Sequence, residues 1–201
     1  PNSAPLGMSF YRYMIQAWTA EFCAGWHAEN ARRRLVTPSG LHPYTVYLGI
    51  AAIFLAAAAL IGGMVGLISF IAIALHAQMQ LFLSDYIQHY GLRRAISADG
   101  KPEPMGPQHS WNAPHPYSSA LMMSAPRHSD HHMRPGRHFT ELTHDPRTMP
   151  TLPRSVPVMG AIAFVPPLWR RMMDARAARW SGDLTPPTAP ESAPVISFVT
   201  R

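Results

Sequence analysis

The stretch Val46–Ser84, VYLGIAAIFLAAAALIGGMVGLISFIAIALHAQMQLFLS, contains no Asp, Glu, Lys or Arg. A helix needs about 20 apolar residues to cross a hydrocarbon core of about 30 Å. This stretch is about twice as long, and Gly62-Gly63 near its middle permits a tight turn. The sequence therefore predicts two helices, about 46–61 and 64–90, that form a transmembrane hairpin. A single buried core helix is the alternative, and it would need a very large soluble core.

Positive charges flank this apolar run on both sides. The chain has 17 Lys and Arg against 11 Asp and Glu, a net charge of +6, and every Lys and Arg lies outside 46–84. A hairpin places both flanks on one side of a membrane, and the positive-inside rule makes that side the cytoplasm. One continuous span would instead put Arg32–Arg34 and Arg93-Arg94 on opposite sides. We therefore interpret the positions of the positive charges as a sign of membrane orientation. The sequence shows no RNA-binding pattern and no DNA-recognition helix that would favour nucleic acid as a partner.

Residues 1–34 are predicted to form a loop followed by a helix. Six apolar residues recur there at helical spacing: Phe10, Tyr11, Met14, Ile15, Trp18 and Phe22. Trp18 and Trp26 suit a membrane interface, and the basic cluster Arg32–Arg34 follows them. An ordinary surface helix that packs on a neighbour explains the pattern equally well.

Three histidines lie close together in the segment Arg127-His128-Ser129-Asp130-His131-His132. In a helix, side chains at i, i+3 and i+4 lie on one face. Neutral imidazoles held that close form half of a site for iron, zinc or copper. The alternative is a polar surface helix that binds nothing. The single Cys23 excludes an internal disulfide, a cysteine-rich zinc site and an iron–sulfur cluster built from this chain alone.

A further histidine, His89, follows the apolar run in the segment Asp85-Tyr86-Ile87-Gln88-His89-Tyr90-Gly91-Leu92. The second predicted span leaves the hydrocarbon core near Ser84, so His89 is expected one or two helical turns beyond it, at the cytoplasmic mouth. The proline-rich stretch 95–126 is predicted to be a loop that brings His89 and His128 together.

The remainder of the chain contains one more apolar segment. Val156–Trp169 has 14 residues and three prolines, so it is too short to span a membrane. A membrane-surface segment or a segment that covers the core is expected instead. Residues 170–180 predict a basic helix, and 181–201 predict a disordered tail because they are rich in Pro, Ser and Thr. Residues 1–180 are expected to form one domain.

Taken together, these motifs resemble the integral-membrane alkane monooxygenases of the histidine-rich membrane di-iron hydroxylase/desaturase superfamily. Arg127–His132 is similar to the R-H-S-D-H-H box of that family, and Asp85–Leu92 is similar to its N-Y-x-x-H-Y-G-L box. His109–Asn112 is similar to H-S-W-N, and Pro166–Arg171 is similar to P-P-L-W-R-R. Their order and spacing match over about residues 10–180.

The resemblance implies an all-α, integral-membrane helical bundle with a histidine-rich cap on the cytoplasmic side of the bacterial inner membrane. It implies two non-haem irons held by the side chains of His89, His128, His131 and His132. It also implies that O2 and electrons from rubredoxin convert the terminal methyl group of an n-alkane into a primary alcohol. A basic cytoplasmic face would steer an acidic electron donor towards this cap.

The chain departs from this family in several places. The upstream boxes of the kinds H-E-x-x-H and E-H-x-x-x-H-H are absent, and four histidines cannot satisfy two irons. We therefore expect this chain to be the C-terminal portion of a longer protein, with about half of the site. Asp85 stands where the family has asparagine; Asp85 and Asp130 are expected to support the ligands through hydrogen bonds, although Asp130 fits a solvated aspartate equally well.

Three other functions remain open on the sequence. A xylene-type methyl hydroxylase and a fatty-acyl desaturase belong to the same superfamily. A non-catalytic membrane fragment whose histidines bind zinc or nothing would show the same residues. The sequence leaves the length of the substrate chain undefined.

Overall fold

The structure of the chain is a computed structural model that describes residues 3–36 and 40–181. Within these residues the regular secondary structure is helical, apart from two isolated β-bridges, which confirms the predicted all-α fold. The chain divides into two compact units. We call Ser9–Ile87 the hairpin unit, and Ser3–Met8 together with 88–181 the histidine unit. The predicted tail lies outside the described residues from 182 onwards.

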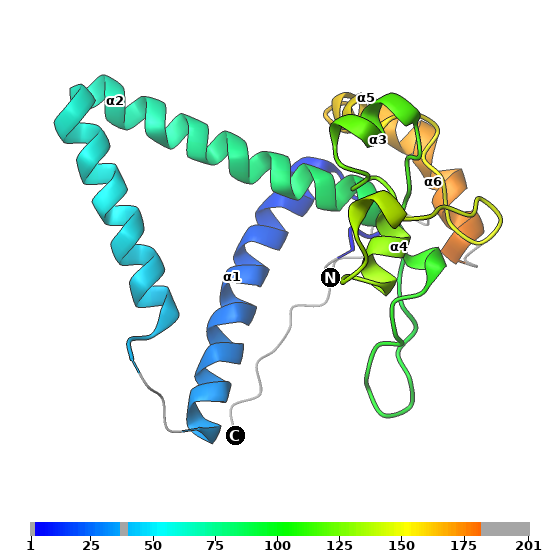
Figure 1. Ribbon diagram of the computed structural model, residues 1–201, viewed down its shortest axis with the longest axis horizontal. Helices are drawn as coiled ribbons and strands as arrows, with labels where there is room; N and C mark the ends of the chain where they lie inside the picture. Colours follow the sequence, from blue (N-terminus) through cyan, green and yellow to red (C-terminus); the bar gives the residue numbers. More distant parts are fainter. Residues whose placement is uncertain (1–2, 37–39, 182–201) are drawn as a thin grey trace. The chain divides into compact units, whose positions relative to one another are not determined.

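The long helix α2, Pro43–His89, consists of two helical arms that meet at Gly63 (Figure 1). Gly63 has φ 58° and ψ −150°, a conformation that is open essentially to glycine alone. The chain therefore bends where Gly62-Gly63 predicted a turn. Near the bend the arms lie close together, because the rings of Phe54 and Phe70 stack with centroids 6.3 Å apart. Among the described residues, α2 is the helix with the length and apolar composition to cross a membrane.

The helix α1, Phe10–Leu35, contacts both arms of α2 within the hairpin unit. At its beginning, Tyr13 donates a hydrogen bond to the carboxylate of Asp85. Farther along, the ring of Phe22 packs edge-on against Tyr44, with centroids 5.0 Å apart. Each arm of α2 thus contacts a different part of α1, and the three helical segments enclose a triangle (Figure 1).

The buried face of α1 differs from the apolar face predicted from the sequence. Phe10, Tyr13 and Ala17 are buried. Most of the other predicted apolar residues are exposed: Tyr11, Ile15, Trp18 and Phe22. The difference arises because Tyr13 and Ala17 fit closely against α2, whereas bulkier side chains are covered only in part, as at Trp18, whose ring centroid lies 6.1 Å from that of Phe82. An outward apolar face is the arrangement that the membrane-interface interpretation of α1 requires.

The histidine unit is built from short helices and loops. Its elements, in chain order, are η1 (Pro107–His109), α3 (Pro116–Leu121), α4 (His128–Met133), η2 (Phe139–Glu141), α5 (Val156–Ala163) and α6 (Pro166–Ser181). The core of this unit contains two fully buried tryptophans, Trp111 and Trp169. Helix α6 begins at Pro166, earlier than the predicted helix at 170, because proline is well accommodated in the first turn.

The end of α2 is anchored inside the histidine unit by Tyr90 and Gly91. The hydroxyl of Tyr90 accepts a hydrogen bond from the backbone N–H of Gly7 at 2.7 Å and donates one to Asp174 of α6 at 2.5 Å. Gly91 has φ 71°, and a Cβ there would lie 2.6 Å from the Cβ of Ala177. The helix thus ends at His89 because the glycine two residues on adopts a left-handed conformation and lets α6 approach closely.

Candidate metal centre

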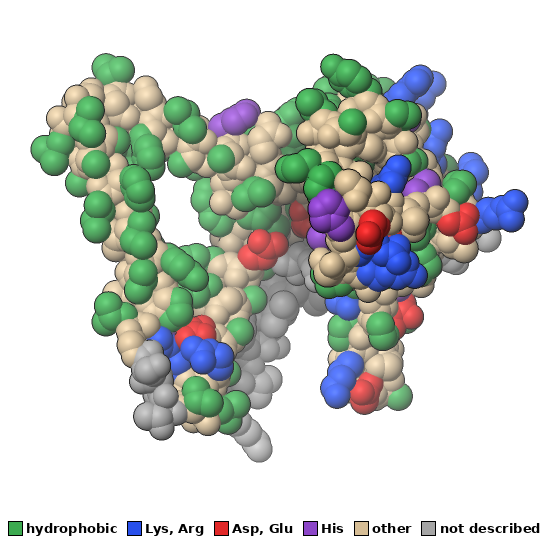
Figure 2. Space-filling view, in the orientation of Figure 1, with side chains coloured by type: hydrophobic (Ala, Val, Ile, Leu, Met, Phe, Trp, Pro, Cys, Tyr) green, Lys and Arg blue, Asp and Glu red, His purple; other side chains and the backbone are tan. Residues whose placement is uncertain are grey.

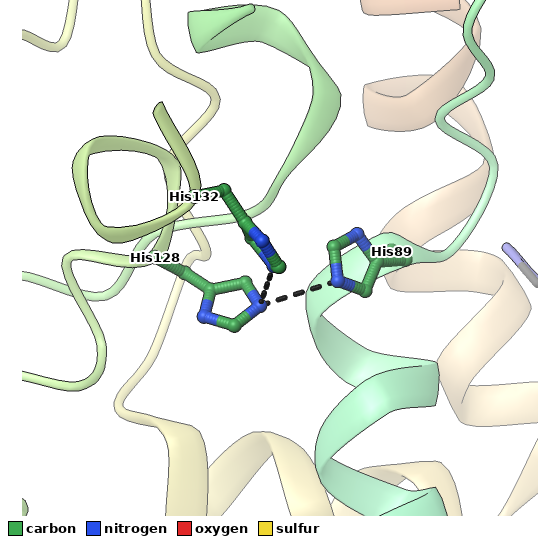
Figure 3. A group of neighbouring side chains, drawn as sticks. All are labelled: His89, His128 and His132. Carbon is green, nitrogen blue, oxygen red and sulfur yellow. Dashed lines mark hydrogen bonds between the residues drawn. The ribbon is translucent and has the colours of Figure 1, made fainter. Parts of the chain in front are cut away.

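Three imidazoles from two segments meet in the histidine unit (Figure 3). His89 is the last residue of α2, whereas His128 and His132 lie one turn apart on α4. The Nε2 atom of His128 lies 3.2 Å from Nε2 of His89 and 2.8 Å from Nε2 of His132. The candidate ligand atoms of the three residues all lie within 4.8 Å of one another. We call these three residues the histidine trio.

The orientation of the His89 ring follows from its second nitrogen. Nδ1 of His89 lies 3.2 Å from the backbone carbonyl oxygen of His109. A carbonyl oxygen can only accept, so Nδ1 carries the proton and Nε2 keeps its lone pair. That lone pair is directed at the trio. An N–H to carbonyl contact of this kind is how metal-binding histidines are commonly oriented in proteins.

The environment of His128 keeps its imidazole neutral. Burial is the largest cause, followed by the positive charges that His89, His132 and His131 would carry, and together they lower the pKa of His128 to about 2. A histidine must be neutral to donate a lone pair to a metal. His128 is therefore in the ligand-competent form throughout the physiological pH range.

The fourth predicted ligand, His131, lies outside the trio. His131 is exposed, and its ring centroid lies 6.3 Å from that of His128 and 5.9 Å from that of His132. Side chains of successive helical residues diverge by about 100°, and in this structure His132, not its neighbour His131, is grouped with His89 and His128. Its role as a ligand remains a prediction.

Asp130 is fully buried, so it is not a solvated aspartate. Its carboxylate accepts hydrogen bonds from the backbone N–H of Thr143 at 2.8 Å and from Arg137 at 3.0 Å. Burial alone raises the pKa of Asp130, but the hydrogen bonds from Thr143 and the charges of Arg137 and Arg134 outweigh burial and hold the pKa below its usual value. Asp130 thus ties α4 to the loop that follows. The other predicted supporting residue, Asp85, belongs to the hairpin unit, where it accepts the hydrogen bond from Tyr13.

The segment His109–Asn112 connects the two sources of the trio. On one side, the backbone N–H of Trp111 donates to the carbonyl of Gln88 at 2.7 Å, and its indole N–H donates to the carbonyl of Tyr90 at 2.8 Å. On the other side, Asn112 accepts from the backbone N–H of Ser129 at 3.0 Å. The spacing of the histidines did not predict that this segment holds α2 and α4 together. The resemblance of His109–Asn112 to H-S-W-N did point to the same residues.

The donor set fits a transition-metal ion. Imidazole ligands at about 2.1 Å from a metal and roughly at right angles are separated by about 3 Å, close to the 2.8 and 3.2 Å between the Nε2 atoms of the trio. Three neutral nitrogens suit iron, zinc and copper alike. The described residues add no carboxylate to this group, so a second metal would need further ligands.

Comparisons with known proteins agree with this picture. The family model described as fatty acid desaturase matches residues 1–163. The chain is 30% identical to alkane 1-monooxygenase 2 of Alcanivorax borkumensis, over 91% of this chain and 49% of the relative. It is 31% identical to alkane 1-monooxygenase of Ectopseudomonas oleovorans over 90% of this chain and 46% of the relative, and 42% identical to alkane 1-monooxygenase 1 of Alcanivorax borkumensis over 52% and 26%. The chain spans about half the length of the curated relatives it matches.

Proposed function

Because the chain belongs to the fatty acid desaturase family, among the histidine-rich membrane di-iron hydroxylases and desaturases, we propose that it is the C-terminal part of a membrane alkane 1-monooxygenase. The reaction is the O2-dependent hydroxylation of the terminal methyl group of an n-alkane. One observation carries the proposal: the convergence of three Nε2 atoms from α2 and α4. The names of the relatives supply the substrate class.

Iron is the metal that we propose for the trio. His89, His128 and His132 hold one iron, and His131, on the exposed side of α4, reaches a second iron whose other ligands come from outside this chain. The irons supply the oxidising power that an alkane C–H bond requires, because that bond offers no group on which acid–base catalysis could act. The contribution of this chain is to hold neutral imidazoles in place and to orient them through the carbonyl of His109.

An apolar groove in the hairpin unit supports an alkyl substrate. It has a volume of about 370 Å³, and sites of this size commonly take small apolar ligands. The groove lies between α1 and both arms of α2. Its lining is almost entirely apolar: Trp18, Ala51, Phe54, Leu55, Phe70, Ile71, Ala74, Leu75 and Gln78. An alkane has no polar group, so an apolar lining can accommodate it without leaving buried polar groups unpaired.

We infer the membrane location of the site from helix α2 and its orientation from the positions of the positive charges. We propose that both arms of α2 cross the bacterial inner membrane and that the histidine unit lies on the cytoplasmic side, because all Lys and Arg lie outside 46–84. The other partners are O2, membrane lipid and rubredoxin as the electron donor. The excess of arginines in the histidine unit would steer an acidic donor towards it.

The experiment compares two histidine substitutions in the longest reading frame that contains this chain. His128→Ala should abolish both iron binding and the conversion of octane to 1-octanol, because it removes the imidazole at the centre of the trio. His138→Ala is the matched control, since His138 is exposed and contacts Thr140 instead of the trio. Iron is measured by elemental analysis of the purified protein and alcohol by gas chromatography. Full iron content in the His128→Ala variant would refute the site.

A second measurement separates the competing functions. Cells that produce the same protein are given octane, p-xylene and a saturated fatty-acyl substrate in parallel. Formation of 1-octanol supports the proposal, 4-methylbenzyl alcohol identifies a xylene-type hydroxylase, and a new double bond identifies a desaturase. A protein that binds iron yet converts none of them would be a non-catalytic metal-binding fragment.

A further inference from the structure

Helix α5 presents an apolar face to its surroundings. Val156, Met159, Gly160 and Ala163 are buried and form the inward face of the helix. The outward residues, however, are Pro157, Val158 and Ala161, and the helix contains no polar side chain at all. A helix that is apolar all round is normally enclosed on every side. The outer face of α5 therefore fits an apolar environment better than water.

In the neighbouring helix α3, polar side chains are buried and apolar side chains are exposed, which reverses the usual arrangement on the surface of a soluble protein. Its two serines, Ser118 and Ser119, are buried, whereas Tyr117 is 85% exposed and Leu121 is 75% exposed. In a protein surrounded by water the opposite arrangement is expected. The inversion does not extend to the whole unit, because large apolar side chains such as Trp111, Trp169 and Met173 are buried elsewhere in it. Like α5, α3 has the pattern expected where the surroundings are less polar than water.

The outward faces of α3 and α5 form one surface. Tyr117 and Val158 line the same open depression of about 330 Å³, together with His115, Ser118, Arg154 and Ser155. Figure 2 shows apolar side chains gathered over these two helices, with Lys and Arg side chains beside them. We call the outward residues of α3 and α5 the apolar cap face.

Every charged side chain in the segments around this face is positive. Neither 104–129, which contains α3, nor 146–173, which contains α5, includes an Asp or Glu. Arg154 precedes α5, and Arg170 and Arg171 follow it; all three are exposed. Apolar side chains bordered by arginines are the composition of segments that lie in the interface of an anionic bilayer. A protein partner would have to be both apolar and acidic to match as well.

We propose that the apolar cap face docks on the surface of a phospholipid bilayer, with Arg154 against anionic headgroups and Val158, Tyr117 and Leu121 in the headgroup–acyl boundary. The face is covalently joined, through His89, to the helix that we propose to span the membrane. Docking would hold the histidine trio close to the lipid from which an apolar substrate enters. The inference depends on the membrane location of α2 and is independent of the metal and the reaction.

The test is a quenching experiment on the full chain in vesicles of phosphatidylcholine and phosphatidylglycerol. Cys23 is replaced by serine, and a single cysteine is introduced for bimane labelling by Leu121→Cys, Val158→Cys or Lys101→Cys. Brominated lipids should quench bimane at 121 and 158 several-fold more strongly than at 101, and aqueous iodide should do the reverse. Lys101 is the control because its side chain is 81% exposed and lies in a polar turn.

Two other outcomes would overturn the proposal. If iodide reaches 121 and 158 while brominated lipid does not, the face lies in water. If neither quencher reaches them, another protein segment or a second copy covers the face. Leu60→Cys, near the bend of α2, reports on the membrane proposal separately. Strong lipid quenching at 60 with none at 121 and 158 refutes docking alone, and no quenching at 60 refutes the membrane location as well.

The role of the arginine is tested with lipid composition. Replacing phosphatidylglycerol with phosphatidylcholine should weaken lipid quenching at 158 in the chain with Arg154, but should change it little in an Arg154→Gln variant. Equal quenching with and without anionic lipid in both chains would show that charge does not contribute. If Val158→Cys fails to fold, Ala161→Cys supplies a second position on the same face. Helix content by circular dichroism identifies such a failure.

Discussion

The Nδ1 atom of His89 lies 3.2 Å from the backbone carbonyl oxygen of His109, and this contact directs the lone pair of the opposite nitrogen into the histidine trio. The segment that supplies the carbonyl also holds α4 through Asn112. His89 and His128 lie 39 residues apart in the chain, yet the segment His109–Asn112 contacts both parts of the site. We call this segment the template. Its hydrogen bonds are buried, so small changes in it should alter the geometry of the histidine trio.

Asn112→Ala should weaken both the fold and metal binding. Asn112 is fully buried, and its amide contacts the hydroxyl of Ser129 at 2.7 Å and the carbonyl of Pro150 at 3.1 Å. The backbone N–H of Ser129, which donates to the amide oxygen of Asn112 at 3.0 Å, would lose this partner at a cost of about 1–3 kcal/mol, and loss of an outer support typically weakens metal affinity by about 10–100-fold. Thermal unfolding and iron titration measure the two effects.

The control for this variant is Asn30→Ala. Asn30 lies near the exposed end of α1, where its amide contacts the carbonyl of Trp26 one turn earlier, so its removal should change stability by less than about 0.5 kcal/mol. If Asn112→Ala behaves like Asn30→Ala in both measurements, the template has no role in setting the site.

Gly91→Ala should destabilise the histidine unit strongly. Its left-handed backbone disfavours a Cβ by about 1–2 kcal/mol, and the new atom would also lie 2.6 Å from Ala177 and 3.2 Å from Leu6. Overpacking of this kind adds about 1–3 kcal/mol. Gly100→Ala separates the two effects, because Gly100 has φ 77° and no neighbour within 4 Å. Chemical denaturation should show a clearly larger loss for Gly91→Ala; similar losses would mean that α6 does not press on this position.

Gly63→Ala should disrupt the bend of α2, whereas Gly62→Ala should not. Gly63 adopts a backbone conformation that alanine strongly disfavours, but no atom lies within 4 Å of a Cβ at either position. The effect is thus conformational rather than steric. Cysteines in place of Phe54 and Phe70 report the bend by disulfide cross-linking in membranes. Efficient cross-linking in the Gly63→Ala background would contradict the assignment of the turn to this glycine.

Acid should loosen the C-terminal end of α1 through Glu29. Hydrogen bonds from Arg32 and Arg33 lower the pKa of Glu29 from 4.5 to about 2. Because the pKa is lower in the folded state, the folded chain binds this proton less tightly than the unfolded chain. The stabilisation is therefore complete above pH 4.5 and is lost as the pH falls towards 2. Glu29→Gln should flatten this dependence, measured as helix content against pH; an unchanged acid profile would exclude Glu29 as its source.

Several features of the fold could be predicted because they depend on local chemistry. A charge-free run of apolar residues as long as 46–84 is typical of helix, because buried strands are much shorter, and Gly62-Gly63 marks the bend because only glycine tolerates the required φ and ψ. The spacing of His128 and His132 predicts a shared helical face, since residues four apart lie one above the other. The resemblance to alkane monooxygenases also rested on linear motifs, and the family match agrees with it.

Other features depend on what lies across from each side chain, so periodicity could not reveal them. The inward face of α1 is chosen by the shape of α2, which accepts Tyr13 and Ala17. The burial of Asp130 depends on Thr143 and Arg137, which approach it from a loop downstream.

By itself, the sequence determined the long helices α1 and α2, the position of the bend in α2 and the pairing of His128 with His132 on one face, because each follows from covalent geometry and from the spacing of neighbours along one helix; the short helices η1 and α3, which lie within the predicted loop 95–126, it did not reveal. Only the tertiary structure decided that His89 completes this pair while His131 stays outside it. It also decided that the serines of α3 are buried while its apolar residues face outwards. The physical reason is that contacts between distant segments depend on how their surfaces fit, and that fit is not encoded in the pattern of either segment alone.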